Sequence, residues 1–512
     1  MIISGENMKK VLMIILDGFG IREEELGNAV KMANMPNFQR LLSEYPNTLL
    51  EASEEAVGLP KGQFGNSEIG HLTIGSGKVT KSKIKIINDS LASDELEQNK
   101  VFNDLVAHVK ERDSALHLMG LVSDGGVHSH LDYFKQIIHI LKLKEVKKVY
   151  FHVITDGRDT KVDSGINYVN ELKSVLEENN VGEIVSLSGR YYAMDRDKKY
   201  DRTKLYYDVI TGQKVANAPD ACKCIDACYE KEIFDEFIPP LLMNKEGVIK
   251  DNDGLFWLNF RPDRAVQILT SLTNPEFNEF PTVKYQNLKV ITMFPTAESV
   301  KANYIFEDVS EGGLSLGKYF SELELTQARI AETEKYAHVT YYFDGGVDQR
   351  LKNAKYYLIP SPKVATYDQE PEMKAREITE QVIKCMEDDR DFILVNFANP
   401  DMVGHTGIIS ATIKALEVLD ECLGKIVEEV ENNFYTLFLL SDHGNADLML
   451  DDVGNPVTTH SLSKVPFIIT DKELKIKEGT LADVAPTILS YMDIAIPEEM
   501  KNSKVLITNK ME

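Results

Sequence analysis

Short apolar runs separated by amphipathic stretches recur along the whole 512-residue chain. Seven of these runs have the pattern of strands buried on both faces; they cover residues 11–16, 116–122, 149–154, 184–187, 255–260, 392–397 and 436–440. Amphipathic helices are predicted between them, and the clearest has one apolar face made of Ile413, Leu416, Leu419, Leu423, Ile426 and Val430. Alternating strands and helices predict an α/β fold with mostly parallel sheets.

The residues that follow the predicted strands fall into two chemical groups. Carboxylates and imidazoles follow the strands nearest the two ends of the chain, whereas the arginine-bearing segments ITDGRDT, SGRYYAMDRD and NFRPDR follow strands between them. Ligands of open α/β sheets bind beyond the carboxyl ends of the strands. We therefore predict two domains: a metal-binding domain from residues 1–81 and 312–512, and an inserted α/β domain from residues 82–311.

Composition narrows the choice of partners. The formal net charge of −24 argues against nucleic acid or an anionic membrane as a partner, although a small anionic substrate fits where positive charge gathers locally. No apolar run reaches the roughly 18–20 residues of a membrane span, and the run at 11–16 leads directly into Asp17 and Gly18, as a strand does. We expect a cytoplasmic protein.

Five cysteines do not form the pattern of a secreted disulfide framework. Three of them, Cys222, Cys224 and Cys228, cluster in a segment that reads as a helix. Their spacing lacks paired C-x-x-C knuckles, so we expect reduced thiols rather than a zinc site.

Metal-ligand residue types recur in three segments near the carboxyl end of the chain. NPDMVGHTG holds Asp401 and His405, SDHGNAD holds Asp442 and His443, and TTHSLSKVPF holds His460. Any one of them alone is more often a cap or turn residue. Together with Asp17 they predict a site for two divalent ions, and mixed imidazole and carboxylate donors suit Mn²⁺, Zn²⁺, Fe²⁺ or Co²⁺.

Ser67 lies in a glycine-rich turn that leads into a predicted helix from Glu68. A serine at this position is commonly only the N-cap of the helix. The alternative is a nucleophile activated by metal coordination, next to helix N–H groups that can bind phosphate.

The segments GNSEIGHLTIGSG, LVSDGGVHSH, TDGRDT, GRYYAMDRDKKYDR, NFRPDRA, AETEKYAHVT, VNFANPDMVGHTG and SDHGNAD resemble the cofactor-independent (2,3-bisphosphoglycerate-independent) phosphoglycerate mutases, in order, from about residue 9 to residue 500. That family belongs to the alkaline phosphatase superfamily. The resemblance implies an alkaline-phosphatase-like domain with an inserted domain. It also implies interconversion of 3-phosphoglycerate and 2-phosphoglycerate, in glycolysis and gluconeogenesis, by a monomer that needs no bisphosphoglycerate.

The same resemblance implies roles for individual residues. One ion would be held by Asp401, His405 and His460, and the other by Asp17, Ser67, Asp442 and His443, with Ser67 accepting the phosphoryl group. The family's ions are usually manganese, sometimes magnesium or cobalt. The implied substrate contacts are His128, Arg158, Asp159, Arg190, Arg196, Arg261, Arg264 and Lys335.

Physical reasoning agrees with the arginine set, because a phosphoglycerate carries a carboxylate and a phosphate that forked guanidinium groups bind bidentately. We expect Asp159 to deprotonate the accepting hydroxyl. Alternatives are a phosphopentomutase or phosphatase, which would lack the arginine segments, and a metal-storage or regulatory protein, which would have no need of Ser67. Two departures from the family are the extension at residues 1–7, which leaves Met8 as a second candidate start, and the loop at 341–357, where Asp344 replaces the usual Asn or Ser.

Overall fold

A computed structural model describes residues 8–214, 218–307 and 313–509. The chain forms two compact units, which we call the terminal unit (Met1–Lys85 and Val309–Glu512) and the inserted unit (Ile86–Asp308). The sequence predicts these boundaries at 81/82 and 311/312. Residues 308–312, at the second predicted boundary, and the extension at 1–7 lie outside the described residues.

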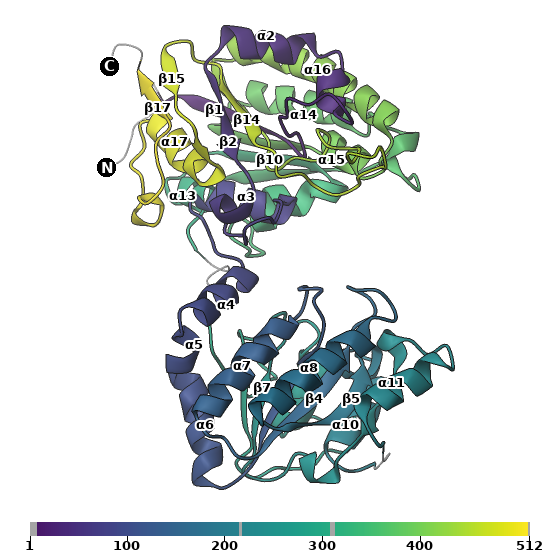
Figure 1. The fold of residues 1–512 in the computed structure, drawn as a ribbon. Helices are drawn as coiled ribbons and strands as arrows, with labels where there is room; N and C mark the ends of the chain where they lie inside the picture. The colour runs from purple at the N-terminus through teal and green to yellow at the C-terminus, as the bar shows by residue number, and fades with distance from the viewer. Residues whose placement is uncertain (1–7, 215–217, 308–312, 510–512) are drawn as a thin grey trace. The chain divides into compact units, whose positions relative to one another are not determined.

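The terminal unit is built on an eight-stranded sheet in which β1 is a central strand (Figure 1). The strands β11, β10, β12, β1 and β13 are parallel neighbours, and β14 then runs antiparallel to β13. Across the sheet the order is β11 (Ala354–Ile359), β10 (Gln327–Glu332), β12 (Phe392–Phe397), β1 (Lys10–Leu16), β13 (Tyr435–Leu440), β14 (Val465–Ile469), β2 (Asn47–Glu51) and β16 (Gly479–Thr480).

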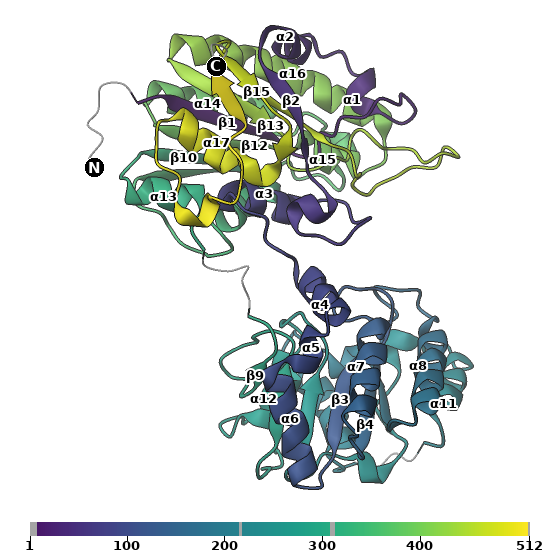
Figure 2. The same cartoon turned by 60° about the vertical axis from the view of Figure 1, so that its left-hand side comes forward.

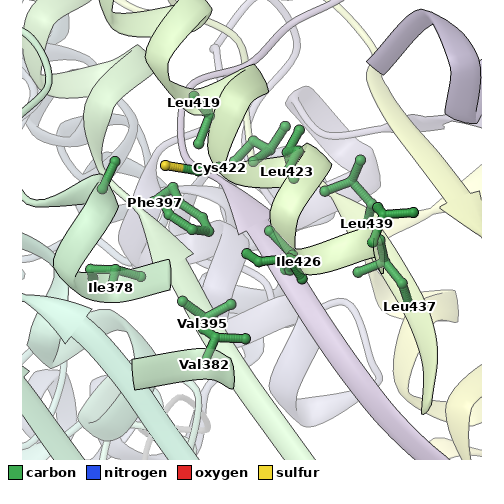
Figure 3. Close-up of a cluster of buried hydrophobic side chains, with 14 of the residues drawn as sticks. Ile378, Val382, Val395, Phe397, Leu419, Cys422, Leu423, Ile426, Leu437 and Leu439 are labelled. Atoms are coloured by element: carbon green, nitrogen blue, oxygen red, sulfur yellow. The ribbon is translucent and has the colours of Figure 1, made fainter. Parts of the chain in front are cut away.

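Helices cover both faces of this sheet, and the side chains of each buried strand point alternately to the two faces. On β1, Leu12, Ile14 and Leu16 face a core shared with α2 (Pro36–Glu44), α14 (Ala375–Glu387) and α16 (Ile409–Asn432). Figure 3 shows part of this core, where side chains of α14 and α16 meet those of β12 and β13. The intervening β1 residues face α3 (Ser67–Ser76), α13 (Leu316–Glu322) and α17 (Val484–Tyr491). A strand buried on both sides explains the continuous apolar run at residues 11–16.

The inserted unit has a seven-stranded sheet (Figure 2), all parallel except for the short edge strand β6. Its order is β6 (Leu241–Leu242), β5 (Glu183–Gly189), β4 (Val149–Thr155), β3 (Leu116–Leu121), β7 (Gly254–Trp257), β8 (Lys289–Thr292) and β9 (Asn303–Tyr304). One face packs on α10 (Tyr200–Ile210) and α12 (Val266–Thr273). The other packs on α6 (Lys100–Glu111), whose side chains leave no space for a Cβ at Gly254, and on α7 (Leu131–Leu143), whose Phe134 lies against Gly120.

All seven predicted strands are present, as β1, β3, β4, β5, β7, β12 and β13, and α16 covers the predicted long amphipathic helix. The predicted strand at 255–260 is shorter than expected, because β7 ends at Trp257. The clustered cysteines lie in a helix, α11 (Ala221–Tyr229), and all five cysteines are free. Within the described residues, no helix is both long enough and apolar enough to cross a bilayer.

Candidate metal centre and nucleophile

Three neighbouring parallel strands of the terminal unit end at one edge of its sheet, and each delivers metal-ligand residues there. Asp17 directly follows β1, which lies between β12 and β13. After β12, the short helix α15 (Asn399–Gly404) carries Asp401 near its start and ends at His405. Asp442 and His443 follow β13. Parallel pairing therefore gathers donors from segments nearly 400 residues apart.

Ser67 is the first residue of α3, and it is not the N-cap. Asn66 caps the helix, with its side chain accepting from the N–H of Ile69. The buried hydroxyl of Ser67 lies 3.0 Å from Asp17 Oδ1 and 2.9 Å from His443 Nε2. Close packing of α3 requires Gly70, because a Cβ there would lie 2.8 Å from the Cβ and carbonyl oxygen of Asp442. With α3 packed this closely, the hydroxyl of Ser67 faces the carboxylate and imidazole donors.

The first of two donor groups is made of Asp401, His405 and His460. Oδ1 of Asp401 lies 3.1 Å from His405 Nε2 and 3.3 Å from His460 Nε2, and the two imidazole nitrogens are 3.2 Å apart. Three ligand atoms at such spacings can converge on a single cation.

The second donor group surrounds Ser67. His443 Nε2 lies 3.5 Å from Asp17 Oδ1 and 3.6 Å from Asp442 Oδ2. All three side chains are fully buried, and Asp442 Oδ2 accepts no hydrogen bond from any described residue. A buried carboxylate oxygen without a donor is costly unless a cation satisfies it. The residues present thus fit a second divalent ion.

Backbone carbonyls orient the three imidazoles. Nδ1 of His405 donates to Thr458 O at 2.7 Å and Nδ1 of His460 donates to Gly65 O at 2.8 Å. Nδ1 of His443 lies 3.2 Å from the carbonyl oxygen of Gly444. A carbonyl only accepts, so each Nδ1 carries a proton. Once the imidazole is neutral, its Nε2 presents a lone pair to the donor group, as a metal-ligating histidine requires.

His71, which the sequence analysis did not select, braces this site without being free to bind metal. Its Nδ1 donates to the carbonyl of Ser67 at 2.9 Å and lies 3.1 Å from Asp442 Oδ2. Its Nε2 is 3.1 Å from Nδ2 of Asn396, an amide that also donates to Asp17 Oδ2 at 2.7 Å. Because both ring nitrogens are engaged, His71 fixes the start of α3. Its only sequence signal is a spacing of four residues from Ser67, which puts both on one helix face.

Lys335 lies in the terminal unit among the donors of both groups. It ends the turn η4 (Thr333–Lys335) after β10, and its ammonium lies 2.7 Å from Asp17 Oδ1, 2.7 Å from Ser67 Oγ and 2.6 Å from Asp401 Oδ2. Burial by itself lowers the pKa of Lys335, but Asp17 and Asp401 outweigh that effect and raise it. A permanent positive charge is therefore held against the nucleophile.

The carboxylates and the imidazole shift one another's protonation. Burial favours the neutral form of Asp17 and Asp401, yet Lys335 and the histidines hold the pKa of each well below its usual range. Burial also opposes the charge on His443, but Asp442, Asp17 and Asp401 raise its pKa to about 9. Without a divalent ion His443 is consequently protonated at neutral pH, and an ion that binds there must displace a proton.

The inserted unit gathers the other predicted substrate contacts around one pocket. Arg158, Arg190 and Arg264 line this pocket, together with Tyr191, Arg202 and Glu236, which the sequence analysis did not select. Arg190 donates to Asp156 Oδ1 at 2.7 Å and also to Asp159.

The remaining predicted contacts lie beside the same arginines. Arg196 and Arg261 both approach Asp263, at 2.9 and 3.7 Å. His128 is buried, and burial followed by the charge of Arg190 lowers its pKa to about 4, so it is neutral at pH 7. Buried nitrogens without a partner among the described residues include His128 Nδ1, Arg190 Nε and Arg264 Nε. Such groups suit an anionic, hydrogen-bonding ligand.

Comparison with known proteins agrees with these two sites. A family model described as "Metalloenzyme superfamily" matches residues 9–496. The chain is 45% identical to the 2,3-bisphosphoglycerate-independent phosphoglycerate mutase of Clostridium tetani (strain Massachusetts / E88), covering 98% of this chain and 99% of the relative. It is 44% identical to the protein of the same name from Clostridium perfringens (strain SM101 / Type A), covering 97% and 99%.

Among solved structures, the phosphoglycerate mutase of Leishmania mexicana, crystallised at low cobalt concentration, matches with a TM-score of 0.66 and 27% identity over 98% of each chain. The superfamily match establishes a metalloenzyme, and its sheets have the expected mostly parallel α/β architecture. The chain belongs, within that superfamily, to the family of 2,3-bisphosphoglycerate-independent phosphoglycerate mutases. The roles of its individual site residues stay predictions.

Proposed function

We propose that this protein is an isomerase that interconverts 3-phosphoglycerate and 2-phosphoglycerate through a phosphoserine at Ser67, without bisphosphoglycerate. The observation that carries the proposal is the position of the Ser67 hydroxyl, within hydrogen-bond distance of Asp17, His443 and Lys335. A helix-capping serine would have no need of that surrounding. Family membership favours this reaction over the phosphopentomutase, phosphatase and metal-storage alternatives.

Two divalent ions would be held by the two donor groups: Asp401, His405 and His460 for one, and Asp17, Ser67, Asp442 and His443 for the other. Bound there, they would lower the pKa of the Ser67 hydroxyl and neutralise phosphate charge. Mn²⁺ is our choice, with Mg²⁺ or Co²⁺ as alternatives, because the donors mix imidazole and carboxylate.

In the first step, Ser67 Oγ attacks the phosphorus of 3-phosphoglycerate. The new Oγ–P bond forms as the bond from phosphorus to the C3 oxygen breaks. The Ser67 hydroxyl gives up its proton, and the C3 oxygen takes up one proton to become a hydroxyl. Lys335 keeps its charge beside Oγ and offsets the negative charge of the incoming phosphate. His71 holds the carbonyl of Ser67, so the nucleophile keeps its direction.

In the second step, the C2 hydroxyl of glycerate attacks phospho-Ser67, and its proton passes to Asp159. The Oγ–P bond breaks, Oγ of Ser67 regains a proton as Asp159 releases the one it took, and 2-phosphoglycerate forms, so no water is consumed. The arginine pocket would retain glycerate between the steps through its carboxylate, which guanidinium groups bind bidentately. Both phosphoglycerates are small molecules, and neither nucleic acid nor a membrane takes part in this reaction.

We further propose that the protein acts in glycolysis and gluconeogenesis as a cytoplasmic monomer. The substrate pair supports the pathway, and five free thiols are typical of a reducing compartment.

Incubation of the Mn²⁺-loaded protein with 3-phosphoglycerate, in the absence of bisphosphoglycerate, tests the function directly. Phosphorus NMR should show 2-phosphoglycerate appearing while free phosphate stays at the background level. Release of free phosphate as the main product would indicate a phosphatase and contradict the proposal.

Replacing the nucleophile tests its role. Ser67→Ala should abolish turnover, because no other hydroxyl faces Asp17 and His443 among the described residues, while metal content stays near normal through the other ligands. Ser76→Ala is the matched control, since Ser76 is also buried in α3 but its hydroxyl donates to the carbonyl of Lys78. Appreciable mutase activity in Ser67→Ala would exclude a phosphoserine at this position.

A further inference from the structure

The segment at residues 441–447 serves both donor groups. It supplies Asp442 and His443 to the group around Ser67. Two further residues of the segment, Asn445 and Asp447, are fully buried and point instead to the other group. Neither residue was selected from the sequence, and the proposed reaction gives them no role.

Asn445 donates a hydrogen bond to Asp401, the only carboxylate in the group formed by Asp401, His405 and His460. Its Nδ2 donates to Asp401 Oδ1 at 2.8 Å and lies 3.3 Å from the carbonyl oxygen of Asp401. The orientation of the amide is unambiguous, because a carboxylate only accepts. The oxygen that Asn445 holds is the same Oδ1 that lies between His405 Nε2 and His460 Nε2.

The surrounding backbone keeps this amide in place. Gly404, in α15, lies so close that a Cβ would come within 2.5 Å of Asn445 Oδ1. Asn445 therefore has little freedom to leave Asp401, and the carboxylate direction is set by a residue anchored to β13.

Asp447 holds the segment that carries His460. Both of its carboxylate oxygens accept from the hydroxyl of Ser461, at 3.0 and 2.9 Å, and Oδ2 also accepts from Ser463 at 2.6 Å. The N–H of Ser461 in turn donates to Gly444 O at 3.0 Å. Residues 441–447 therefore hold both the carboxylate of Asp401 and Ser461, the neighbour of His460.

We propose that Asn445 is a positioning residue that sets the affinity of the ion held by Asp401, His405 and His460, with little effect on the ion held around Ser67. The inference rests on the proposed two-ion site. Its physical basis is that hydrogen bonds to a ligating carboxylate fix its direction, and their loss typically costs 10–100-fold in metal affinity.

The test is a Mn²⁺ titration of the full-length protein, followed by electron paramagnetic resonance of free Mn²⁺ and by calorimetry. Wild type should bind two ions. Asn445→Leu, which removes the donor at similar volume, should weaken one ion by about 10–100-fold and leave the other within twofold. Asn445→Ser, which is too short to reach Asp401, should do the same and serves if the leucine variant does not fold.

Asn37→Leu is a closely matched control. Nδ2 of Asn37 donates to Oδ2 and to the carbonyl of Asp420, at 3.0 and 3.1 Å, in a contact between α2 and α16 that involves none of the predicted ligands. That variant should bind both ions normally.

His405→Ala identifies which ion is lost, because it removes a ligand of the Asp401 group. Asn445→Leu added to His405→Ala should not weaken the remaining ion further. Equal weakening of both ions, or unchanged binding of both, in Asn445→Leu would overturn the inference. Fewer than two ions in wild type would instead overturn the proposed two-ion site.

Discussion

Lys335 brings a positive charge to the candidate metal centre, where its ammonium contacts Asp17, Ser67 and Asp401. We expect Lys335→Met to lower turnover by about 100-fold or more, because a preorganised charge beside the nucleophile is lost. Metal affinity should not fall, since a buried cation that repels the ions is also removed. Isothermal titration with Mn²⁺ and steady-state assays measure the two effects separately.

Lys318→Met is the control for that change, because Lys318 is a partly buried lysine of the same unit whose ammonium contacts only the carbonyl of Gly313 among the bonds described. It should leave turnover unchanged. A parallel fall of metal affinity and turnover in Lys335→Met would mean that the lysine holds the donors in place rather than supplying charge.

Metal binding should strengthen as pH rises. Although burial opposes it, nearby carboxylates raise the pKa of His443 to about 9, and Asp401 raises the pKa of His405. Both imidazoles must lose a proton to bind an ion, so each proton competes with the metal below its pKa. Apparent Mn²⁺ affinity, measured at constant ionic strength, should therefore increase from pH 6 to pH 9. At sub-saturating metal the activity should fall on acidification, and a flat profile would contradict this linkage.

At the residue scale, the sequence predicts which carboxylate and imidazole side chains come together, but not the residues that hold them in place. Asp17, Asp401, Asp442 and His443 follow apolar runs, so their positions at strand ends could be inferred before the fold was known. Asn396 and Asn445 contact those donors only across the fold, and nothing local in the chain distinguishes them from ordinary buried polar residues. His71 has one local signal, its spacing of four residues from Ser67, which is too common in helices to select it.

Among the elements, β10 carries a buried acid that makes stability depend on pH. Glu332, at the end of this strand, is 1% exposed, and burial raises its pKa from 4.5 to about 7. A raised folded-state pKa contributes stability below about pH 4.5, and that contribution is lost as pH rises through 7. Glu332→Gln should remove this slope and stabilise the protein at pH 8 by an amount on the order of 3 kcal/mol at most.

Urea unfolding of both proteins at pH 5 and pH 8 measures this difference. Glu334→Gln provides the comparison, because Glu334 is exposed and only two residues away. If Glu332→Gln were destabilising at both pH values, its packing and not its protonation would dominate.

Polarity is also why β10 escaped the sequence analysis. The strand contains Gln327 and Arg329, which break the apolar run although both are fully buried. Arg329 is accommodated by Gln327 and by Asp344, and its guanidinium lies over the ring of Phe343. Asp344 therefore supplies a charge partner for a buried arginine. Pro466 lies within β14, and a proline argues against a strand when only the sequence is read.

At the scale of the whole molecule, each unit has a core of its own, so metal should stabilise only one of them directly. The single tryptophan, Trp257, is fully buried in β7 of the inserted unit, whereas every predicted metal ligand lies in the terminal unit. Mn²⁺ at about 100 times its dissociation constant should raise the melting midpoint of the terminal unit by roughly 5–10 °C. Trp257 fluorescence should melt at the same temperature with or without metal.

Circular dichroism and tryptophan fluorescence, recorded on the same sample with Mn²⁺ and with a chelator, distinguish the outcomes. A metal-dependent shift in circular dichroism alone would agree with independent units. Equal shifts in both signals would show that the two units unfold together.

The central place of β1 has a consequence for how the protein is made. Its two hydrogen-bonded neighbours, β12 and β13, begin at residues 392 and 435. A ribosome therefore synthesises the whole inserted unit while the apolar strand at residues 10–16 still waits for both of its partners. Unpaired apolar strands are prone to aggregate. The nascent terminal unit thus has to be shielded until β13 has been made, late in translation.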